Sequence, residues 1–406
     1  MSWIVESILG LHNWSHAVRK VKASLRKTDT PLRLGVLGAA AINPVAIFDP
    51  VATHPDVAIV GIAARSKAKA EAQIAKYKLS GTRAYGSYED LLADEEIEAI
   101  YCPLPNGLHY EWALKSLAAG KHVLAEKPIA SNADQVRELK RVSLKTGKIV
   151  LEAFHWRFHP AAHLVKSLAE SGEYGAVQEV TARAVIPAGA LAKDDIRFSY
   201  ALAGGSCMDL TYVFSATSYF AVPALGEGTT VDVLEARPRI NAQDKDVDEA
   251  MAATYTISNH GKTVTCHTES DLAEPWLFGL IPRIWSMPFL RIGLEKATID
   301  FPAFPGPWVN HTITVTDKHS GKVVKKCSQY TDGPQWGTRG QRFWTTYRYM
   351  LEAFVEGVRA VQSGEKSVQE VDAGRIGIPW VPLDESIAEM GIIDQTYERA
   401  GLPLRK

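Results

Sequence analysis

The chain has 406 residues, 46% of them hydrophobic, which is enough for two packed domains. Its 45 basic and 46 acidic residues give a formal net charge of −1, so nothing in the composition favours a nucleic-acid partner. The four cysteines are scattered without CxxC spacing, which disfavours disulfides and zinc and favours a reducing, cytoplasmic compartment.

Residues 1–30 are predicted to form an amphipathic helical extension with a basic second half. Its apolar residues recur at helical spacing: Ile4, Ile8, Leu11, Trp14, Val18, Val21 and Leu25. A signal peptide is disfavoured because Glu6 interrupts the apolar stretch, and no run in the chain reaches the ~20 residues of a membrane span. Three interpretations are open for this row of apolar side chains. It could belong to a helix docked on the protein itself, to a dimer or membrane-surface helix, or to a targeting segment.

Residues 31–155 are predicted to form a dinucleotide-binding domain of the Rossmann type. Apolar strands are predicted at 32–40, 57–66, 97–105, 121–128 and 148–156, and the helices between them at 42–55, 67–79, 87–94, 109–120 and 133–147. Strict alternation of strand and helix indicates a doubly wound parallel sheet in an α/β fold, whose ligands bind at the carboxyl ends of the strands.

Residues 156–406 are predicted to form a substrate-binding and oligomerisation α+β domain. A helix is predicted from Pro160 through about Ser171, closed by Gly172, and alternating strands are predicted at 176–187, 229–240, 251–258, 262–270, 290–301 and 311–317. The strands indicate a large, mostly antiparallel open sheet. Late helices are predicted at 341–364 and 382–401, and they could pack back on the Rossmann domain.

The segment 274–290 is unusually apolar for a connection between strands. It is interpreted either as a buried insertion or as a subunit contact or pocket lid, since large apolar patches are rarely left in water. Together with the open sheet it favours an oligomer, and a homodimer is the commonest soluble form.

The first strand ends in a turn of small residues, Gly-Ala-Ala-Ala-Ile-Asn. Of the dinucleotide pattern Gly-x-Gly-x-x-Gly only Gly38 holds its place, with Ala40 and Asn43 at the other two positions. Small residues let the backbone around Ala39 and Ile42 approach a pyrophosphate, and the helix that follows supplies N–H donors. A plain tight turn is the alternative, but the strand before and the helix after favour dinucleotide binding.

The end of the second strand favours NADP over NAD. No acidic residue is present where an NAD enzyme would hold the ribose hydroxyls; instead the stretch offers Arg65, Ser66, Lys67 and Lys69. An adenosine 2′-phosphate is attracted by arginine and by hydroxyl donors. Ordinary solvated charges at a helix start are the alternative.

The third strand ends between two prolines, Pro103 and Pro105, with Leu104 between them. Proline cannot continue a strand ladder or a helix interior, so a sharp turn is expected there. Asn106 and His109 would then lie above the sheet edge, beside the nicotinamide ribose of a bound cofactor.

Four stretches of the chain resemble one family of oxidoreductases. They are CPLPNGLHYEW at 102–112, Glu126-Lys127-Pro128, EAFHWRFHP at 152–160 and GGSCMDL at 204–210. Their order and spacing are similar to those of the glucose-fructose oxidoreductase, inositol dehydrogenase and MocA (Gfo/Idh/MocA) family. The branch of NADP-dependent sugar (xylose) dehydrogenases and dihydrodiol dehydrogenases looks closest. The resemblance runs from about residue 31 onward, and it implies a Rossmann domain, an open-sheet domain and hydride exchange with a nicotinamide.

The resemblance implies that Lys127 is the catalytic lysine, often followed by an unusual peptide bond at the proline. A lysine beside a reacting carbinol can accept the hydroxyl proton or stabilise the alkoxide. If Glu126 keeps it charged, its contribution is electrostatic. A purely structural ion pair between the two is the remaining alternative. Both residues are also expected to contact the cofactor.

By the same resemblance, Asp209 is the aspartate near the substrate. The family usually places a histidine or tyrosine four residues later, where this chain has Val213. Tyr212 could still reach the pocket as a catalytic or substrate-binding group, because residues three and four apart share a helix face. Core packing of this aromatic is the alternative.

Three neighbouring residues, His155, Trp156 and Arg157, are expected to line the sugar side of the cleft, with Trp156 and Arg157 also touching the cofactor. Asp195, in the loop 192–200, could add polar contacts to a hydroxyl-rich substrate, or this loop could simply be solvated.

A metal site is not expected, although His155, His159 and His163 are spaced by four. Pro160 disfavours a helix at His159, and no further ligands cluster nearby.

The sequence therefore predicts an NADP-dependent oxidoreductase of a small carbohydrate or carbonyl, of the aldose 1-dehydrogenase type. A trans-dihydrodiol dehydrogenase or dicarbonyl reductase could use the same site. A different class, an NADP-binding regulator without catalysis, is disfavoured by the presence of Lys127.

Overall fold

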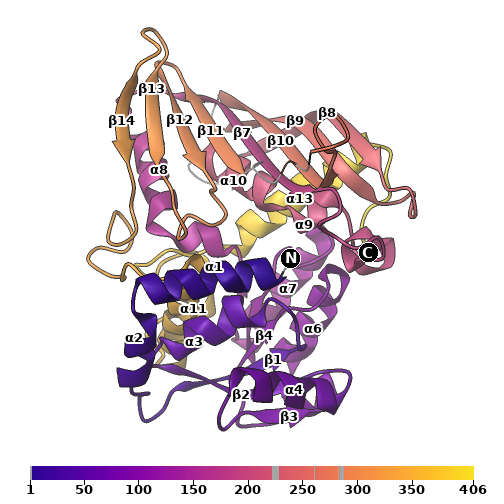
Figure 1. The fold of residues 1–406 in the computed structure, drawn as a ribbon, viewed down its shortest axis with the longest axis vertical. Helices are drawn as coiled ribbons and strands as arrows, with labels where there is room; N and C mark the ends of the chain where they lie inside the picture. The colour runs from indigo at the N-terminus through magenta and orange to yellow at the C-terminus, as the bar shows by residue number, and fades with distance from the viewer. Residues whose placement is uncertain (1, 222–227, 260, 282, 284–287) are drawn as a thin grey trace. The chain divides into compact units, whose positions relative to one another are not determined.

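The computed structural model describes residues 2–221, 228–259, 261–281, 283 and 288–406, which divide into two compact units (Figure 1). The first unit comprises Met1–Ile129, Arg137–His159 and Thr338–Leu383. The second comprises Ala130–Val136, Pro160–Gly337 and Asp384–Lys406. Each unit is thus assembled from segments of both halves of the chain.

The first unit contains the predicted doubly wound sheet, in which all strands are parallel. The strands are β1 (Leu32–Leu37), β2 (Val57–Ala63), β3 (Arg83–Tyr85), β4 (Ala99–Cys102), β5 (His122–Ala125) and β6 (Val150–Glu152), in the spatial order β3-β2-β1-β4-β5-β6. Their central strands are almost wholly buried, as expected for a parallel sheet covered on both faces. The predicted α/β fold is confirmed.

Two details of this sheet differ from the prediction. β3 was not predicted, because three residues beginning with an exposed arginine give no apolar run. β6 ends at Glu152, and the residues that were expected to extend it form a short 3₁₀ helix, η2 (His155–Phe158).

The helices of the first unit include two segments that lie far from the Rossmann motifs in sequence. Those between the strands are η1 (Pro44–Phe48), a π-helix that continues into α3 (Asp49–Ala52), then α4 (Lys67–Tyr77), α5 (Tyr88–Leu92), α6 (Asn106–Ala118) and α7 (Ala133–Thr146). The late helices α11 (Thr346–Gln362) and α12 (Val368–Asp372) also belong to this unit, and α11 packs on η1, α3 and η2.

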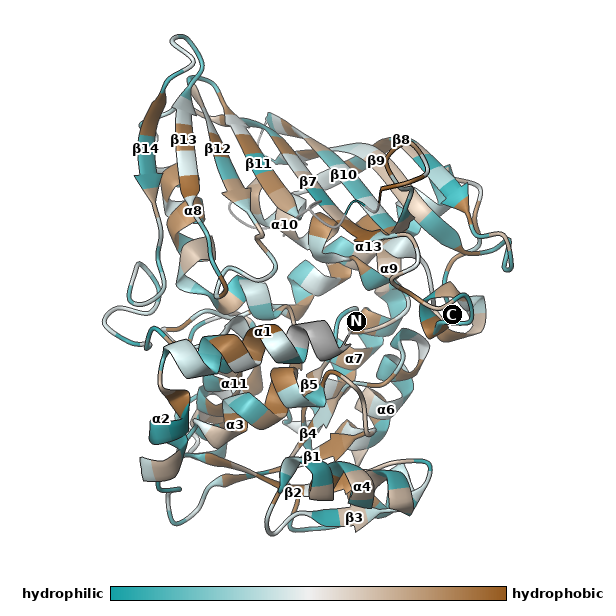
Figure 2. Cartoon of the chain, in the orientation of Figure 1, coloured by the Kyte–Doolittle hydropathy of each residue, from teal (hydrophilic) through white to brown (hydrophobic). Residues whose placement is uncertain are grey.

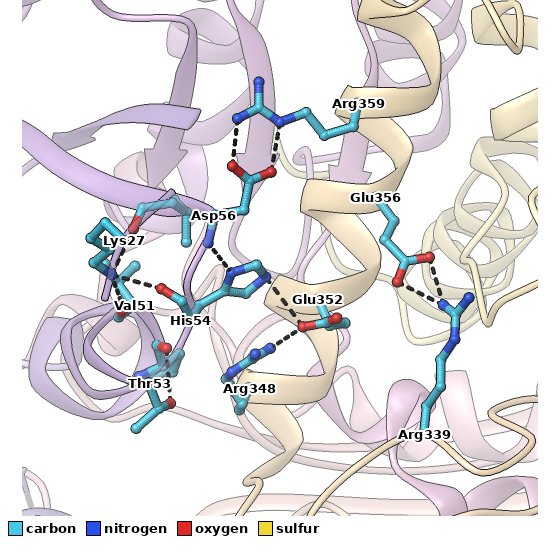
Figure 3. A network of polar contacts seen from close by, with 12 residues as sticks. Lys27, Val51, Thr53, His54, Asp56, Arg339, Arg348, Glu352, Glu356 and Arg359 are labelled. Atoms are coloured by element: carbon cyan, nitrogen blue, oxygen red, sulfur yellow. Dashed lines mark hydrogen bonds and ion pairs between the residues drawn. The ribbon is translucent and has the colours of Figure 1, made fainter. Parts of the chain in front are cut away.

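A polar network fixes α11 beside the turn between α3 and β2 (Figure 3). Glu352 forms an ion pair with Arg348, and its carboxylate lies 3.2 Å from the Nε2 of His54. Two turns further along α11, Arg359 binds Asp56 through two nitrogens, each 2.8 Å from a carboxylate oxygen. The contacts of His54 with Glu352 and of Asp56 with Arg359 join residues about three hundred positions apart.

The N-terminal extension docks on the first unit. It forms α1 (Ser2–Ser15) and α2 (Val18–Ser24), with Asn13 donating to Asp49 at 2.8 Å. The ammonium of Lys27 donates to the carbonyls of Val51, His54 and Val57 at 2.7–2.8 Å. Of the interpretations open for this segment, the structure favours a helix packed on the protein itself. Among the described residues, no helix combines the length and apolarity needed to cross a bilayer.

The second unit is built on the predicted open sheet. Its strands are β7 (Val177–Pro187), β8 (Thr230–Ile240), β9 (Asp248–Asn259), β10 (Lys262–Glu274), β11 (Phe289–Leu294), β12 (Ala297–Pro302), β13 (Ile313–Asp317) and β14 (Val323–Cys327). They lie in the order β14-β13-β12-β11-β7-β10-β9-β8, and among the described strands of this sheet only β7 and β10 pair in parallel. Hydrophobic and hydrophilic residues alternate along these strands, as the colours of Figure 2 show.

Helices α8 (Pro160–Glu170) and α10 (Tyr212–Ala221) pack on this sheet, and α9 (Ser206–Asp209) and α13 (Leu383–Arg399) complete the unit. The predicted strand 290–301 is a hairpin of β11 and β12. The exposed edge strand β14 was not predicted, because its residues VVKKC face solvent almost throughout.

The apolar segment 274–290 is not a buried insertion over the part that the structure describes. Phe278 is 85% exposed and Leu280 is 78% exposed, while the indole of Trp276 donates to the carbonyl of Ala188 at 2.9 Å. Residues 282 and 284–287 lie outside the described residues. A subunit contact or a pocket lid stays a prediction for this segment.

Candidate functional site

The turn after β1 requires a glycine at position 38. Gly38 has a φ of 103°, a backbone conformation that side chains rarely adopt, and its N–H donates to the carbonyl of Ala63 at 2.7 Å. A Cβ atom at this position would lie 3.0 Å from a methyl group of Leu104. Ala39, Ala40 and Ile42 follow in the sequence and are half-buried, so this turn is partly exposed to solvent.

Asn43, at the third position of the glycine pattern, supports the turn with its side chain. It is fully buried, and its amide donates to the carbonyl of Gly38 at 2.9 Å and to Gln73 at 3.0 Å. Gln73 in turn donates to the carbonyl of Ala40 at 3.0 Å. Gln73 was not predicted as a site residue, because one glutamine in a helix rich in polar residues gives no signal in the sequence.

The residues expected to select the cofactor follow β2 at its carboxyl end. Arg65, Ser66 and Lys69 are all exposed, and Ser66 precedes α4 without capping it through its side chain. The Arg65 guanidinium acts on the phenol of Tyr88, where burial raises the pKa and the arginine charge opposes that rise. These cationic and hydroxyl groups fit the 2′-phosphate of an adenosine ribose.

His109 links the turn after β4 to the turn after β5. Its Nδ1 lies 2.7 Å from the carbonyl oxygen of Pro128, and its Nε2 lies 2.6 Å from that of Leu104. Burial lowers the pKa of His109 to about 4, so the neutral ring carries one N–H and donates to one of these carbonyls at a time. The peptide bond between Lys127 and Pro128 is cis, the unusual bond that the resemblance implied.

Glu126 and Lys127 directly follow β5 and are half-buried. The backbone N–H of Glu126 donates to Cys102 at 3.1 Å, and its carboxylate accepts a hydrogen bond of 2.7 Å from the hydroxyl of the buried Tyr101. Burial raises the pKa of Tyr101, and the charge of Glu126 raises it further, so the phenol stays protonated and holds the carboxylate in place.

His155 lies near Lys127 and is held by the start of α11. Its Nδ1 is 2.8 Å from the hydroxyl of Thr346, and its ring stacks on Tyr347 with the centroids 4.0 Å apart. Burial, and then the positive charge of Lys127, lower the pKa of His155 to about 3. The imidazole is therefore neutral at physiological pH. Neither Thr346 nor Tyr347 was predicted, because they come from a helix almost two hundred residues away.

Most of the other predicted residues of the first unit are buried. Trp156 and Arg157 are buried in η2, with the guanidinium 6.0 Å from the indole centroid. Pro103 and Leu104 are buried, and Asn106 is the first residue of α6.

The prediction that the chain holds no metal site stays a prediction. Within the described residues, no three His, Cys, Asp or Glu side chains are grouped so as to hold an ion. His159 lies edge-on to Tyr349, whereas His163 belongs to the second unit.

Asp209 lies in the second unit and is paired with an arginine. The Nε of Arg197 is 2.9 Å from its carboxylate, and a second nitrogen of Arg197 is 3.0 Å from that of Asp195. The charge of Asp209 is the largest influence raising the pKa of Arg197, which keeps the pair ionic. The loop residue Asp195 and the helix residue Asp209 are thus brought together.

The prediction that Tyr212 shares a helix face with Asp209 is wrong. α9 ends at Asp209 and α10 begins at Tyr212, with Leu210 in a non-helical conformation between them. Two residues on either side of such a break do not share a helix face. Tyr212 is half-buried, and a catalytic role for it stays a prediction.

Comparison with known proteins shows that this chain is similar to nicotinamide-dependent oxidoreductases. Residues 32–154 match the model of an oxidoreductase family described as having an NAD-binding Rossmann fold. The chain is 32% identical over 376 residues to D-xylose 1-dehydrogenase (NADP(+)) 2 of Haloferax volcanii, covering 91% of this chain and 97% of the relative. It is 26% identical over 308 residues to trans-1,2-dihydrobenzene-1,2-diol dehydrogenase of Sus scrofa, covering 73% and 88%.

A similar fold occurs in a crystal structure of a 3-ketoreductase from Actinomadura kijaniata in complex with NADP and TDP-benzene. The TM-score is 0.69, the sequence identity is 22%, and the match covers 90% of this chain and 96% of the other. At this identity the comparison shows a shared fold.

Proposed function

Because this chain belongs to the glucose-fructose oxidoreductase, inositol dehydrogenase and MocA family, we propose that it is an NADP-dependent oxidoreductase acting on an aldose. It exchanges hydride with a sugar or polyol carbon, as an aldose 1-dehydrogenase does. One observation supports this above all: Lys127 directly follows β5, at the same carboxyl edge of the sheet as the Gly38 turn after β1. The relative from Haloferax volcanii supports the substrate class.

The residues of the first unit fit NADP. Gly38 presents no side chain to a pyrophosphate, and the small side chains of Ala39 and Ala40 let the backbone of the turn approach one. Arg65, Ser66 and Lys69 would hold the 2′-phosphate. When bound, the nicotinamide supplies the hydride chemistry.

Lys127 would handle the proton of the reacting hydroxyl. An amine beside the carbinol oxygen can accept the hydroxyl proton while the hydride leaves the carbon. Alternatively, a charged amine stabilises the oxygen as it becomes negative. His109 and His155 are neutral, so neither adds a second positive charge beside Lys127. Asp209, fixed by Arg197, is proposed to bind sugar hydroxyls, and Tyr212 is a further candidate for this role.

A turnover assay tests this function. Aldoses including D-xylose, a trans-dihydrodiol and small dicarbonyls would be offered with NADP(H), and the wild-type chain is expected to turn over an aldose. Lys127→Met is expected to lower kcat by about 10²–10⁴-fold while NADP still binds, because general acid–base catalysis contributes rate enhancements of this size. Lys115→Met, in an exposed ion pair, is the matched control.

Turnover of the dihydrodiol or the dicarbonyls alone would identify the second candidate, which the relative from Sus scrofa supports. Tight NADP binding without any turnover would indicate a regulator. A homodimer and a cytoplasmic location complete the proposal. Sedimentation of the purified protein would test the first and fractionation of cells the second.

A further inference from the structure

The second unit contains a buried arginine whose three guanidinium nitrogens all reach acceptors. Arg405 is 1% exposed. Its Nε donates to the carbonyl of Gly204 at 2.7 Å, its Nη1 to that of Pro403 at 2.9 Å, and its Nη2 to the carboxylate of Asp248 at 2.9 Å. The planar fork of arginine can serve three such acceptors at once, which a lysine ammonium in the same place does less well.

Asp248 receives hydrogen bonds at both carboxylate oxygens. One oxygen accepts from Arg405 and from the hydroxyl of Tyr397, each at 2.9 Å. The other accepts from the hydroxyl of Ser206 at 2.7 Å and from the backbone N–H of Cys207 at 2.9 Å. The buried ion pair is therefore bonded directly to the first residues of α9, the helix that ends at Asp209.

The glycine turn before α9 fits closely against this ion pair. Gly205 has a φ of 133°, and a Cβ atom there would lie 2.1 Å from Asp248 and 2.9 Å from Arg405. On its other side, the turn binds the segment that carries the partner of Asp209: the N–H of Gly205 donates to the carbonyl of Arg197 at 2.9 Å. Arg405 thus contacts the Gly204–Gly205 turn. This turn binds the carbonyl of Arg197 and leads into α9, the helix that ends at Asp209.

A second contact also joins the chain near Arg197 to the C-terminal residues around Arg405. The hydroxyl of Tyr200 donates to the carbonyl of Leu404 at 2.7 Å, and its ring lies 5.2 Å from the Arg405 guanidinium. Tyr200 is half-buried, so its hydroxyl can be removed with little risk to folding.

We propose that Arg405 is a positioning residue for the reaction: by holding the Gly204–Gly205 turn, it fixes the Arg197–Asp209 pair in the orientation that binds the sugar. This inference rests on the proposed function and extends it to a residue 196 positions beyond Asp209 in the sequence. A displacement of about 1 Å in a substrate-positioning group can lower a rate by about 10²-fold. The predicted NADP residues belong to the first unit, so NADP affinity should not change.

The test compares kcat, KM and NADP affinity for Arg405→Lys, Tyr200→Phe and a matched control, Arg183→Met. Arg183 likewise pairs with a buried carboxylate, that of Glu274, but it lies on β7 and its hydrogen bonds go to Glu269 and Glu274. Arg405→Lys keeps a positive charge opposite Asp248 but loses the planar guanidinium that donates to three acceptors. We expect kcat/KM for the aldose to fall about 10–100-fold in Arg405→Lys and about 3–10-fold in Tyr200→Phe, with NADP affinity unchanged within about twofold. Arg183→Met should lower stability without this change in kcat/KM.

A double-mutant cycle separates positioning from a general loss of structure. If Arg405 acts through Asp209, then Arg405→Lys has little further effect once Asp209→Asn has been made. Additive effects of the two substitutions would overturn the inference, as would unchanged kcat/KM in both Arg405→Lys and Tyr200→Phe. If Arg405→Lys does not fold, Tyr200→Phe decides alone. A wild-type chain that turns over no aldose would overturn the proposed function and this inference with it, whereas an active wild type with unimpaired variants would overturn the inference alone.

Discussion

At the scale of single residues, the exposed side chain of Arg65 is expected to decide between NADP and NAD. It follows β2 at the carboxyl edge of the sheet, beside Ser66, where the 2′-phosphate of a bound cofactor would lie. A hydrogen bond to a charged group contributes about 1.5–3 kcal/mol, so Arg65→Ala should reduce the ratio of NADP to NAD efficiency by about 10–100-fold. Initial rates with each cofactor measure this ratio.

Lys76→Ala is a suitable control for Arg65→Ala, because Lys76 lies in the last turn of α4, the helix that follows Arg65, away from the carboxyl edge. It should leave the ratio unchanged. An unchanged ratio in Arg65→Ala itself would mean that the arginine is only a solvated charge and that the NADP preference has another source.

Residues within local motifs could be predicted from the sequence, and residues that support them from a distance could not. Gly38 and Lys127 stand at strand ends within recognisable stretches, so their positions at the sheet edge followed from strand–helix alternation alone. Thr346 supports His155 across 191 positions and Arg405 binds Asp248 across 157. Such pairings depend on tertiary packing, for which one sequence offers no periodic or compositional signal.

At the scale of elements, α11 is expected to be held on the first unit by a carboxylate whose protonation weakens the attachment. Burial raises the pKa of Glu352, but the hydrogen bond from His54 and the charge of Arg348 outweigh it and lower the pKa to about 2 from 4.5. A group with a depressed folded-state pKa adds stability above its unfolded pKa and loses it as the pH falls. The contribution of Glu352 should therefore be complete above pH 4.5 and disappear between pH 4.5 and about 2.

Glu352→Gln tests this attachment by leaving Arg348 without its carboxylate. Breaking a buried ion pair costs about 3 kcal/mol, so the variant should be less stable than the wild type at pH 7 by roughly this amount. The difference should shrink below pH 4.5, as urea unfolding at several pH values would measure. Glu356→Gln, one turn along the same helix in the exposed pair with Arg339, should cost less than about 1 kcal/mol. A pH-independent difference for Glu352→Gln would contradict the assignment.

The elements with strong periodic patterns were predicted well, and the short or solvated ones were missed. Buried apolar runs gave the central strands of the parallel sheet, whereas β3 and β14 have three and five residues, none of them buried. The late helix was predicted at 341–364, but α11 begins at Thr346 because the side chain of Thr345 caps it by accepting from the N–H of Arg348. That this helix belongs to the first unit could not be read from its own amphipathic pattern, which shows only that one face is buried.

At the scale of the whole molecule, the first unit should not fold from the Rossmann segment alone. Residues 1–159 contain the complete parallel sheet, but α11 belongs to the same unit and buries Met350, Phe354 and Val358 completely. Without residues 338–383, the surfaces of η1, α3 and η2 that α11 covers would be exposed, and His54 would lose Glu352. At about 1.5–3 kcal/mol each, these three side chains contribute an amount comparable to the whole stability of a typical domain, which is about 5–15 kcal/mol. A fragment of residues 1–159 is therefore expected to melt without a cooperative transition and to bind a hydrophobic dye. The same fragment joined through a flexible linker to residues 338–383 should regain a cooperative transition. Calorimetry of the two proteins makes the comparison, and a cooperative melt of the shorter fragment near the temperature of the full chain would show that α11 is dispensable for this unit.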